Sequence, residues 1–533
     1  MREPIILLSG PISSGKSTLC KLLQSAYGAE HFKTNELIKS TYPGLPSERR
    51  ALQEAGESLD KRTRGRWVCN ALTRMITELI RPSMILVDAV RIPSQIEAFR
   101  IAFGSRVVHI HLTASEAELE RRYKKRSGRI SELGSYAELR QSETERNVDG
   151  LATIADVVIK TDRCTDRDVL IRAAARLGLY PRAVVPLVDI LVGGQYGSEG
   201  KGHISSFLAT EYAYLVRVGG PNAGHKVYRG KQDEPYTFHQ LPSGTITSEA
   251  RLIIGPGANI SLDALFKEIA DCKVSAERLS IDPQAMIIEK QDLDFEKRYL
   301  EKEISSTAQG VGAATARRIN GRGGAMNVKL AKDIKDLRPF VRSTGEILER
   351  AYLKKERIFL EGTQGTSLSI YHGPYPKVTS RDTTVSGCLA EAGISAKRVR
   401  RVVMVCRTYP IRVGGDSGPM SQEISFKEIA HRSGLSFAKL KKTERTSTTN
   451  KDRRVGEFDW EQLRRSTVLN GPTDLALTFV DYIQKSNTEA RRFEQLTIDT
   501  INFVEEVERV SGVPVSLIST RFHFRSIIDR RAW

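Results

Sequence analysis

With 533 residues, the chain is too long for one compact domain, and about 150 residues per domain would allow three or four domains, or one large α/β domain and a smaller one. A composition of 40% hydrophobic and 27% charged residues excludes disordered, fibrous and membrane proteins. The 82 Lys and Arg residues exceed the 64 Asp and Glu residues by 18, which favours anionic partners such as nucleotides, nucleic acid or an acidic membrane surface.

The six cysteines lie far apart and form no C-x-x-C pair, so neither a zinc cluster nor a disulfide framework is expected. A reducing, cytoplasmic location fits this cysteine usage. The apolar stretch at residues 5–8 is far shorter than the ~20 residues of a membrane-spanning helix, and no other segment reaches that length. No membrane partner is therefore expected.

The first 180 residues read as alternating strands and helices. Short apolar runs predict strands at residues 5–9, 84–88 and 106–112, and helical patterns predict helices at residues 16–24 and 115–126. Such alternation predicts an α/β domain with a parallel sheet covered by helices, over residues 1–180.

A glycine-rich loop follows the first predicted strand. Residues 10–17 read Gly-Pro-Ile-Ser-Ser-Gly-Lys-Ser and match G-x-x-x-x-G-K-[ST] between a strand and a helix. In this motif backbone N–H groups hold phosphate, the lysine neutralises it and the serine hydroxyl reaches Mg²⁺. The nucleotide-binding residues expected here, with Ser17 also a metal ligand, are Gly10, Gly15, Lys16, Ser17 and Thr18.

The residues after this loop resemble small P-loop nucleotide kinases. Asp88 ends the second strand and Arg91 follows closely, like the Asp-Val-Arg stretch of deoxynucleoside monophosphate kinases. A basic stretch resembles a lid over the phosphates, although such a face is more often solvated surface. The residues of this stretch are Arg121, Arg122, Lys125, Arg126 and Arg129.

A boundary is expected near residues 178–181, followed by a second domain at residues 186–533. A strand is predicted at residues 187–192, and a second glycine-rich loop follows it. Residues 192–203 read Val-Gly-Gly-Gln-Tyr-Gly-Ser-Glu-Gly-Lys-Gly-His, and many glycines with one lysine after a strand indicate a phosphate-binding nest. Residues 216–225 then read Val-Arg-Val-Gly-Gly-Pro-Asn-Ala-Gly-His. These two passages resemble the adenylosuccinate synthetase family, and further family passages follow in order, among them Leu-Glu-Gly-Thr-Gln-Gly-Thr at 360–366. The resemblance implies a large α/β synthetase-like domain.

The resemblance also implies a reaction. Ligases of this family transfer the γ-phosphate of GTP to the 6-oxygen of IMP, and the amine of aspartate then displaces phosphate. His225 matches the general acid, Gly224 the backbone ligand of Mg²⁺, and Gly200, Lys201 and Gly202 the phosphate cradle, with Lys201 counted as catalytic.

Further residues are assigned by the same resemblance. Asn222, Thr307, Gln364, Leu368 and Thr379 match positions that hold the purine monophosphate, and Gln364 is also counted as catalytic. Arg322 matches an arginine that a neighbouring subunit supplies, which implies a homodimer, and Arg412 is placed with the nucleotide-binding residues. The stretch 446–454 resembles the aspartate-binding loop, with these candidate residues: Thr448, Thr449, Lys451 and Arg453.

Several positions depart from the family pattern. Ser198 replaces the acidic residue that takes the N1 proton and binds Mg²⁺; the same exchange resembles phage relatives that use dGMP, which favours GMP or dGMP over IMP. Residues 478–481 read Thr-Phe-Val-Asp instead of Thr-Lys-Leu-Asp, and 519–522 read Ser-Thr-Arg-Phe instead of Ser-Thr-Gly-Pro. The carboxylate of Asp481 can still accept hydrogen bonds from guanine. Because the residues around it differ from the family pattern, ATP or dATP is a reasonable alternative to GTP as phosphate donor.

Two functions of different class remain open. The first is a bifunctional enzyme: a nucleotide kinase fused to a ligase joining L-aspartate to a purine monophosphate, with Mg²⁺ and ATP or GTP. The second is a catalytically diverged sensor of purine nucleotides, regulatory or defensive, which Ser198 motivates. Nucleic-acid binding would rest on the basic stretches at 397–401 and 439–442, without a recognised motif.

Overall fold

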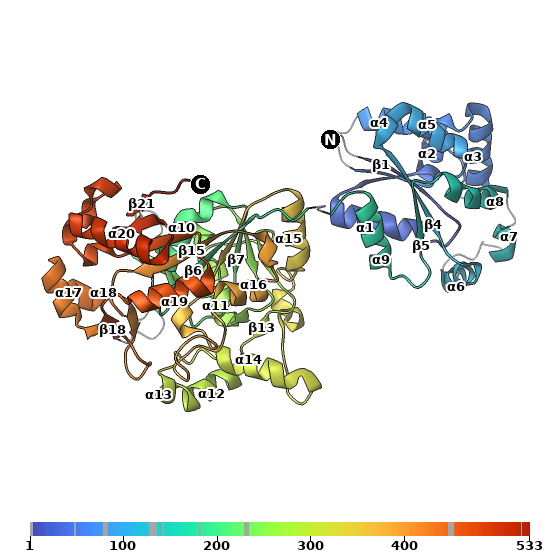
Figure 1. Cartoon of the computed structure of the whole chain (residues 1–533). Coiled ribbons are helices and arrows are strands. Elements are labelled where there is room, and N and C mark those ends of the chain that lie inside the picture. Colours follow the sequence, from blue (N-terminus) through green and yellow to red (C-terminus); the bar gives the residue numbers. More distant parts are fainter. Residues whose placement is uncertain are drawn as a thin grey trace. The chain divides into compact units, whose positions relative to one another are not determined.

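The computed structural model describes residues 4–46, 49–77, 84–126, 136–140, 143–180, 183–228, 234–445, 452–523 and 525–533. The chain forms two compact units, Met1–Arg182 and Ala183–Trp533, which Figure 1 shows in blue to teal and in green to red. Among the described helices, none is both long and apolar enough to cross a membrane.

The first unit is built on a five-stranded parallel sheet with the strand order β2-β3-β1-β4-β5. Its strands are β1 (Ile5–Ser9), β2 (Glu30–Lys33), β3 (Ile85–Asp88), β4 (Val107–Thr113) and β5 (Val157–Lys160). Its helices are α1 (Lys16–Tyr27), α2 (Thr34–Thr41), α3 (Arg49–Thr63), α4 (Arg66–Thr77), α5 (Pro93–Phe103), α6 (Glu116–Arg126), α7 (Tyr136–Arg140), α8 (Glu143–Gly150) and α9 (Asp166–Arg176). Because β1 lies between β3 and β4, the loop after β1 lies between the carboxyl ends of two neighbouring strands.

Alternating residues of β1 enter two separate hydrophobic clusters. Ile5 and Leu7 pack with helices α2 to α5, whereas Ile6 and Leu8 pack with α1 and α9. Both faces of the sheet are therefore buried, as a parallel sheet requires. The predicted α/β class is confirmed. β2, β5, helices α2 to α5 and helices α7 to α9 were not among the predicted elements.

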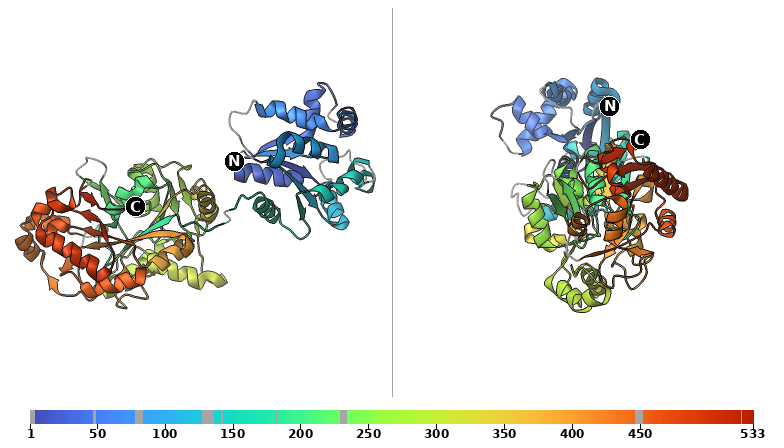
Figure 2. Two further views of the ribbon diagram at one scale, coloured as in Figure 1. Left: turned by 45° about the horizontal axis from the view of Figure 1, so that its top comes forward. Right: turned by 90° about the vertical axis from the view of Figure 1, so that its left-hand side faces the viewer.

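The second unit contains a nine-stranded sheet with the order β12-β10-β7-β14-β6-β15-β19-β20-β21, in which only β21 is antiparallel to its neighbour among the described strands. Its strands are β6 (Val188–Gly193), β7 (Tyr214–Arg217), β10 (Arg251–Ile254), β12 (Leu279–Ile281), β14 (Ile358–Glu361), β15 (Val399–Arg407), β19 (Asp474–Thr478), β20 (Val515–Ser519) and β21 (Ile527–Asp529). Figure 2 shows helices on both sides of this sheet.

Smaller elements surround the large sheet. The helices are α10 (Lys201–Leu208), α11 (Leu262–Asp271), α12 (Lys290–Tyr299), α13 (Glu301–Ile304), α14 (Val311–Asn320), α15 (Thr344–Leu353), α16 (Val385–Ala392), α17 (Phe426–Ser433), α18 (Phe437–Thr443), α19 (Trp460–Asn470) and α20 (Ile498–Ser511). Short strands pair as β8 (His225–Tyr228) with β9 (Pro235–Phe238), β11 (Asn259–Ile260) with β13 (Met286–Ile287), and β18 (Arg453–Gly456) with β16 (Ile411–Val413) and β17 (Glu423–Ile424).

The sheet of the second unit determines where its loops meet. Val188, Ile190 and Val192 of β6 face one hydrophobic cluster, and Leu191 faces the other. Since β6, β7, β14, β15 and β19 run parallel, the loops that follow them lie at the same edge of the sheet. Ligands of open α/β sheets bind at this edge.

Candidate functional site: two glycine loops at carboxyl edges of sheets

The loop at residues 10–15 connects β1 to α1 in the first unit. Gly10 and Gly15 have φ of 141° and 100°, which favours glycine, and a Cβ on Gly10 would lie 2.2 Å from the Leu112 carbonyl oxygen. Lys16 Nζ donates to the carbonyl oxygens of Gly10 at 2.6 Å and Pro11 at 2.9 Å. The lysine thus lies across the loop where a phosphate would be held.

Oxygen ligands lie at the mouth of this loop. Ser17 Oγ donates to Asp88 Oδ2 at 3.3 Å. Burial alone would raise the pKa of Asp88, but contacts with His31 and Lys16 hold it below its ordinary value, so the carboxylate is ionised at neutral pH. A hydroxyl and a carboxylate are oxygen donors of the kind that Mg²⁺ accepts together with nucleotide phosphates. Ser17 and Asp88 therefore fit the predicted metal position.

The predicted lid is only partly visible in the described residues. Arg122 donates to Glu118 at 2.7 Å and to Thr161 at 2.9 Å, and it lines a small hollow with Gly15 and Thr18. Arg121 is exposed and paired with Glu118, and Lys125 is exposed. Arg129 and the side chain of Arg126 lie outside the described residues. Arg91 is half-buried, and its backbone N–H donates to Gln95 Oε1 at 2.8 Å.

The glycine loop of the second unit is built around a buried ion pair. Glu199 is fully buried, and its carboxylate accepts hydrogen bonds from the backbone N–H groups of Gln195 at 3.0 Å and Gly197 at 2.7 Å. Lys201 Nζ lies 2.7 Å from the other Glu199 oxygen and 3.2 Å from the Gly197 carbonyl oxygen. Gly197 and Gly200 adopt φ of 93° and 89°. The role of Glu199 was not predicted, because a glutamate inside a glycine loop carries no local signal of an ion pair.

His225 lies directly beside this loop. A Cβ on Gly202, in the first turn of α10, would come within 2.8 Å of the His225 Cβ, so only glycine permits this approach. His225 Nδ1 contacts the Glu361 carboxylate, which also accepts from Ser243 N–H at 2.8 Å and forms an ion pair with Arg217 Nη1 at 2.8 Å. Glu361 follows from the motif at 360–366 but was not recognised as a partner of His225.

The environment of His225 determines its protonation. Burial, followed by the charge of Arg217, lowers the pKa of His225 to about 4, even though Glu361 acts in the opposite direction. The imidazole is therefore neutral at pH 7 and donates its Nδ1 proton to Glu361. Nε2 is buried and has no hydrogen-bond partner among the described residues.

Two further polar groups at this edge are buried without partners. Oδ1 of Asn222 and Oε1 of Gln364 accept no hydrogen bond within the described part of the chain. Gln364 adopts φ of 64°, and its Nε2 donates to Thr379 Oγ1 at 2.7 Å. The Thr379 N–H in turn donates to the Leu368 carbonyl oxygen at 2.8 Å. The structure thus brings together the predicted residues Gln364, Leu368 and Thr379.

Three other predicted residues of this unit are described by the structure. Thr307 belongs to the segment before α14, and its carbonyl oxygen accepts from Gln309 at 2.9 Å. Arg322 is exposed just beyond α14 and donates only to the Ile319 carbonyl oxygen, at 2.7 Å, within the described contacts. Arg412 is buried, donates to the carbonyl oxygens of Lys377 and Pro419, and lies 4.8 Å over the Tyr196 ring. Arg412 therefore contacts the glycine loop through Tyr196.

The predicted aspartate-binding stretch is only partly described. Thr448, Thr449 and Lys451 lie outside the described residues. Arg453 Nη1 lies 3.1 Å from Glu444, which is buried and also pairs with Arg407 Nη2 at 2.8 Å. Arg407 was not predicted, because this contact joins residues 37 positions apart, one on β15 and the other directly after α18.

The predicted donor-base pocket contains a buried carboxyl group. Asp481 is 8% exposed, and its Oδ1 has no hydrogen-bond partner in the parts of the chain that are described. Burial raises the pKa of Asp481 to about 7. Arg407 lies 4.1 Å over the Phe479 ring, so the aromatic residue in the place of the family's lysine is covered by a cation.

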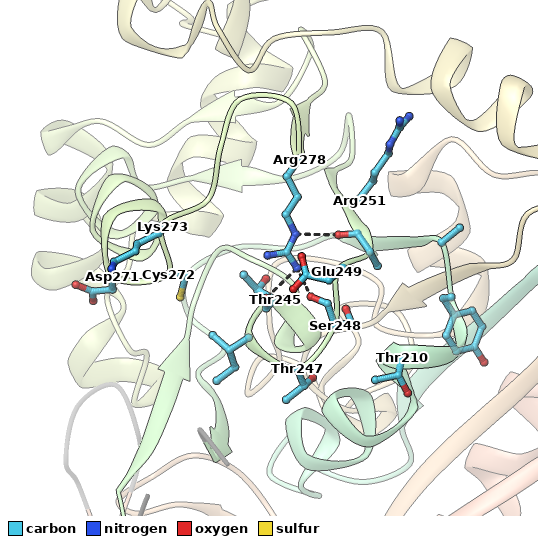
Figure 3. A pocket seen from close by; sticks show the side chains of 14 residues that line it. Thr210, Thr245, Thr247, Ser248, Glu249, Arg251, Asp271, Cys272, Lys273 and Arg278 are labelled. Atoms are coloured by element: carbon cyan, nitrogen blue, oxygen red, sulfur yellow. Dashed lines mark hydrogen bonds between the residues drawn. The ribbon is translucent and has the colours of Figure 1, made fainter. Parts of the chain in front are cut away.

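A large cleft lies elsewhere in the second unit. Its volume is about 920 Å³, and Figure 3 shows its lining residues, including Arg251 and Arg278. It borders the residues that precede β7 and β10, hence the amino ends of these strands, at the opposite edge of the sheet from the glycine loop of this unit. Arg278 uses its donors on the carbonyl oxygens of Ala250 at 3.1 Å and Thr245 at 2.9 Å, so this guanidinium serves the fold.

Comparison with known proteins agrees with this geometry. A family model described as adenylosuccinate synthetase matches residues 190–334 and 324–489, and one described as AAA domain matches residues 6–146. Adenylosuccinate synthetase of Methanocaldococcus jannaschii is 37% identical over 358 residues, covering 66% of this chain and 99% of the relative. The enzyme of Pyrococcus sp. (strain ST700) is 39% identical over 350 residues, covering 64% and 98%.

Two solved structures resemble the second unit. Adenylosuccinate synthetase of Plasmodium falciparum, 21% identical with a TM-score of 0.56, covers 65% of this chain and 100% of its own and supports the fold. Succinoaminodeoxyadenylate synthetase (PurZ) of cyanophage S-2L, bound to dGMP and to dATP as an energy donor, is 26% identical with a TM-score of 0.54, covering 65% and 96%. The chain belongs to the adenylosuccinate synthetase family of ligases and carries a P-loop kinase-like domain before its ligase unit.

Proposed function

We propose that the second unit joins L-aspartate to carbon 6 of a purine nucleoside monophosphate, with GMP or dGMP preferred to IMP. The observation that carries this proposal is the group of three buried, unpartnered polar atoms at one sheet edge: Nε2 of His225, Oδ1 of Asn222 and Oε1 of Gln364. Buried polar groups are normally hydrogen-bonded, so three such atoms beside a phosphate loop are expected to bind a polar ligand.

The described residues supply a phosphate cradle and a general acid for this reaction, and Ser198 stands where the family has the carboxylate that takes the N1 proton. Backbone N–H groups at the start of α10, with Lys201, hold the transferred phosphate as it passes to the 6-oxygen. Anionic phosphate beside Nε2 would raise the pKa of His225, which then donates a proton as phosphate leaves from carbon 6 and the aspartate amine takes its place. Mg²⁺, when bound, neutralises the phosphate oxygens; Ser198 and the Gly224 carbonyl would offer it only neutral oxygens.

The preference for a guanine monophosphate rests on Ser198. A serine side chain is smaller than the family's acidic residue and leaves room for a 2-amino group, and a similar phage enzyme is described as bound to dGMP. Incubation with aspartate, Mg²⁺ and ATP or GTP, with IMP, GMP or dGMP in separate reactions, tests this by mass spectrometry. A succinylated product from IMP alone would contradict the preference, and no product from any combination would contradict the ligase function.

The phosphate donor is proposed to be ATP or dATP. A neutral carboxyl at Asp481 can donate to N1 of adenine and accept from its 6-amino group, whereas an ionised one suits guanine. Initial rates with ATP, dATP and GTP at one fixed monophosphate test the choice, and GTP turning over fastest at pH 6.5 would exclude it.

The first unit is proposed to phosphorylate a nucleoside monophosphate, with Lys16 on the transferred phosphate and Ser17 and Asp88 holding Mg²⁺. A Lys16→Ala variant is expected to lose nucleoside diphosphate formation while succinylated product still forms. Equal loss of both activities would argue against separate sites.

A catalytically diverged nucleotide sensor is the second candidate, favoured by the absence of an acidic side chain at Ser198. It predicts nucleotide binding by calorimetry without any turnover, and restoration by Ser198→Asp would not create activity. Turnover by the unaltered chain would exclude it.

A further inference from the structure

Three potential metal ligands converge inside the first unit. Cys20 of α1, His31 of β2 and Asp88 of β3 offer Sγ, an imidazole nitrogen and a carboxylate oxygen that all lie within 4.8 Å of one another. The residues are 11 and 57 positions apart in sequence, so no spacing motif announces them. Pairing of β2 with β3 and packing of α1 against both strands bring them together.

The cluster is mostly buried, and one of its polar atoms lacks a hydrogen bond. Cys20 is fully buried, and the side chains of His31 and Asp88 are 6% and 13% exposed. Nε2 of His31 has no hydrogen-bond partner within the described residues, although Asp88 Oδ2 lies 3.6 Å away. An imidazole nitrogen that lies close to a carboxylate but makes no hydrogen bond in the described part of the chain is suited to be a metal ligand.

The donor set identifies the class of ion. Mg²⁺ prefers oxygen ligands alone, whereas a thiolate, an imidazole and a carboxylate together suit zinc-like ions, which favour sulfur and nitrogen in tetrahedral sites. Three protein ligands leave a fourth position for water or a phosphate oxygen. The thiol of Cys20 would release its proton to solvent as the metal–sulfur bond forms.

We propose that Cys20, His31 and Asp88 bind a thiophilic divalent ion of the zinc class, which competes with Mg²⁺ for Asp88. Asp88 Oδ2 also contacts Ser17 Oγ at 3.3 Å, at the mouth of the phosphate loop, so one carboxylate serves both positions. Occupation by a zinc-like ion therefore prevents Mg²⁺ from binding in its working position. The competition part of this inference rests on the proposed kinase function, whereas the binding part does not.

Cobalt is the spectroscopic probe for binding. We expect Co²⁺ added to the full chain, without Mg²⁺, to give a near-ultraviolet sulfur-to-cobalt charge-transfer band that Zn²⁺ abolishes by displacement. Cys20→Ala should remove the band, and His31→Asn should weaken Co²⁺ binding by about tenfold or more. Cys69→Ala is the matched control, since Cys69 is another buried cysteine of the same unit, 4% exposed. Folding of each variant is checked by circular dichroism.

The outcomes separate the two parts. The proposed metal site is wrong if the unaltered chain gives no charge-transfer band with Co²⁺, or if the band persists in Cys20→Ala. If Cys20→Ala does not fold, unchanged Co²⁺ binding by His31→Asn contradicts the site instead. In the activity arm, Zn²⁺ should inhibit nucleoside diphosphate formation, excess Mg²⁺ should relieve the inhibition, and ligase activity of the same sample should be unaffected. A band without inhibition overturns the competition, and absence of kinase activity in metal-free samples concerns the proposed function only.

Discussion

At the scale of single residues, the candidate site of the second unit contains two buried ion pairs next to its functional side chains. Arg217 and Glu361 form a buried ion pair under His225, and Glu199 pairs with Lys201 under the glycine loop. Breaking a buried pair from one side leaves an uncompensated charge and costs about 3–5 kcal/mol. These carboxylates therefore serve both stability and the orientation of the groups above them.

His225 is expected to be essential for ligation. Replacement by Asn removes proton transfer at Nε2, so we expect kcat of the ligase to fall by about 10²- to 10⁴-fold. Nucleoside diphosphate formation should be unaffected, because His225 belongs to the second unit. His239→Asn is the matched control, since this histidine bonds the Pro221 carbonyl oxygen through Nδ1 at 3.0 Å. A His225→Asn enzyme with unchanged kcat would contradict the assignment.

Asp481 is expected to make donor choice depend on pH. Its pKa of about 7 is set mainly by burial; Arg407 and Arg521 act against this rise, and Glu444 reinforces it. Tyr482 beside it has a pKa far above 10 and stays neutral. Below pH 7 the protonated carboxyl suits adenine, and above pH 7 the ionised form suits guanine.

The ratio of kcat/KM for ATP to that for GTP should therefore fall as pH rises, by about tenfold per pH unit once Asp481 is mostly ionised. Asp481→Asn carries a permanent donor and acceptor, so the ratio should favour ATP and lose its pH dependence. Measurement of both donors between pH 6 and 8.5 checks this. A flat ratio in the unaltered enzyme would refute the mechanism.

At the scale of elements, the site depends on how closely helix α10 approaches strand β8. Gly202 allows this approach, since an added Cβ would meet the His225 Cβ at 2.8 Å and the Lys226 carbonyl oxygen at 3.1 Å. Strands contribute as well: in the basic stretch at 397–401, Arg400 and Arg401 of β15 pair with Asp189 and Asp474. These two arginines therefore lend no support to nucleic-acid binding.

Gly202→Ala tests the contact between α10 and β8. We expect a loss of about 1–3 kcal/mol in the free energy of unfolding of the second unit, with lower ligase activity, because the backbone and His225 must move apart. Gly345→Ala in the first turn of α15 is the control: residue 345 is exposed and its Cβ would meet no atom within 4 Å, so the free energy of unfolding should change by less than about 0.5 kcal/mol. Calorimetric unfolding distinguishes the two, and an unchanged transition for Gly202→Ala would contradict the tight approach.

At the scale of the whole molecule, the net charge of +18 is the excess of Lys and Arg that remains after every carboxylate is matched by one cation, and each unit has a glycine loop that ends in a lysine. Each unit has its own hydrophobic clusters, formed only from its own residues. Arg322 is exposed in the second unit. The family resemblance implies that this arginine binds the monophosphate in the site of a neighbouring subunit.

Complementation between two inactive variants tests this proposed homodimer. Arg322→Ala and His225→Asn should each lack ligase activity, but their equimolar mixture, after subunit exchange, should recover about a quarter of the unaltered activity, because half of the dimers then contain one intact site. Subunit exchange is verified by mass spectrometry of the mixture. No recovery despite exchange would show that Arg322 acts within its own chain or not at all.

The sequence by itself determined the α/β class, both glycine loops and the family, because these depend on local patterns: an apolar strand, then glycines that permit positive φ, then a lysine at a helix start. Only the tertiary structure revealed Glu361 beneath His225, Arg407 against Phe479, and Cys20 beside His31 and Asp88. These contacts join residues far apart in the chain, and a parallel sheet creates them by bringing strand ends to one edge. Residue types and their spacing along the chain therefore do not predict these contacts.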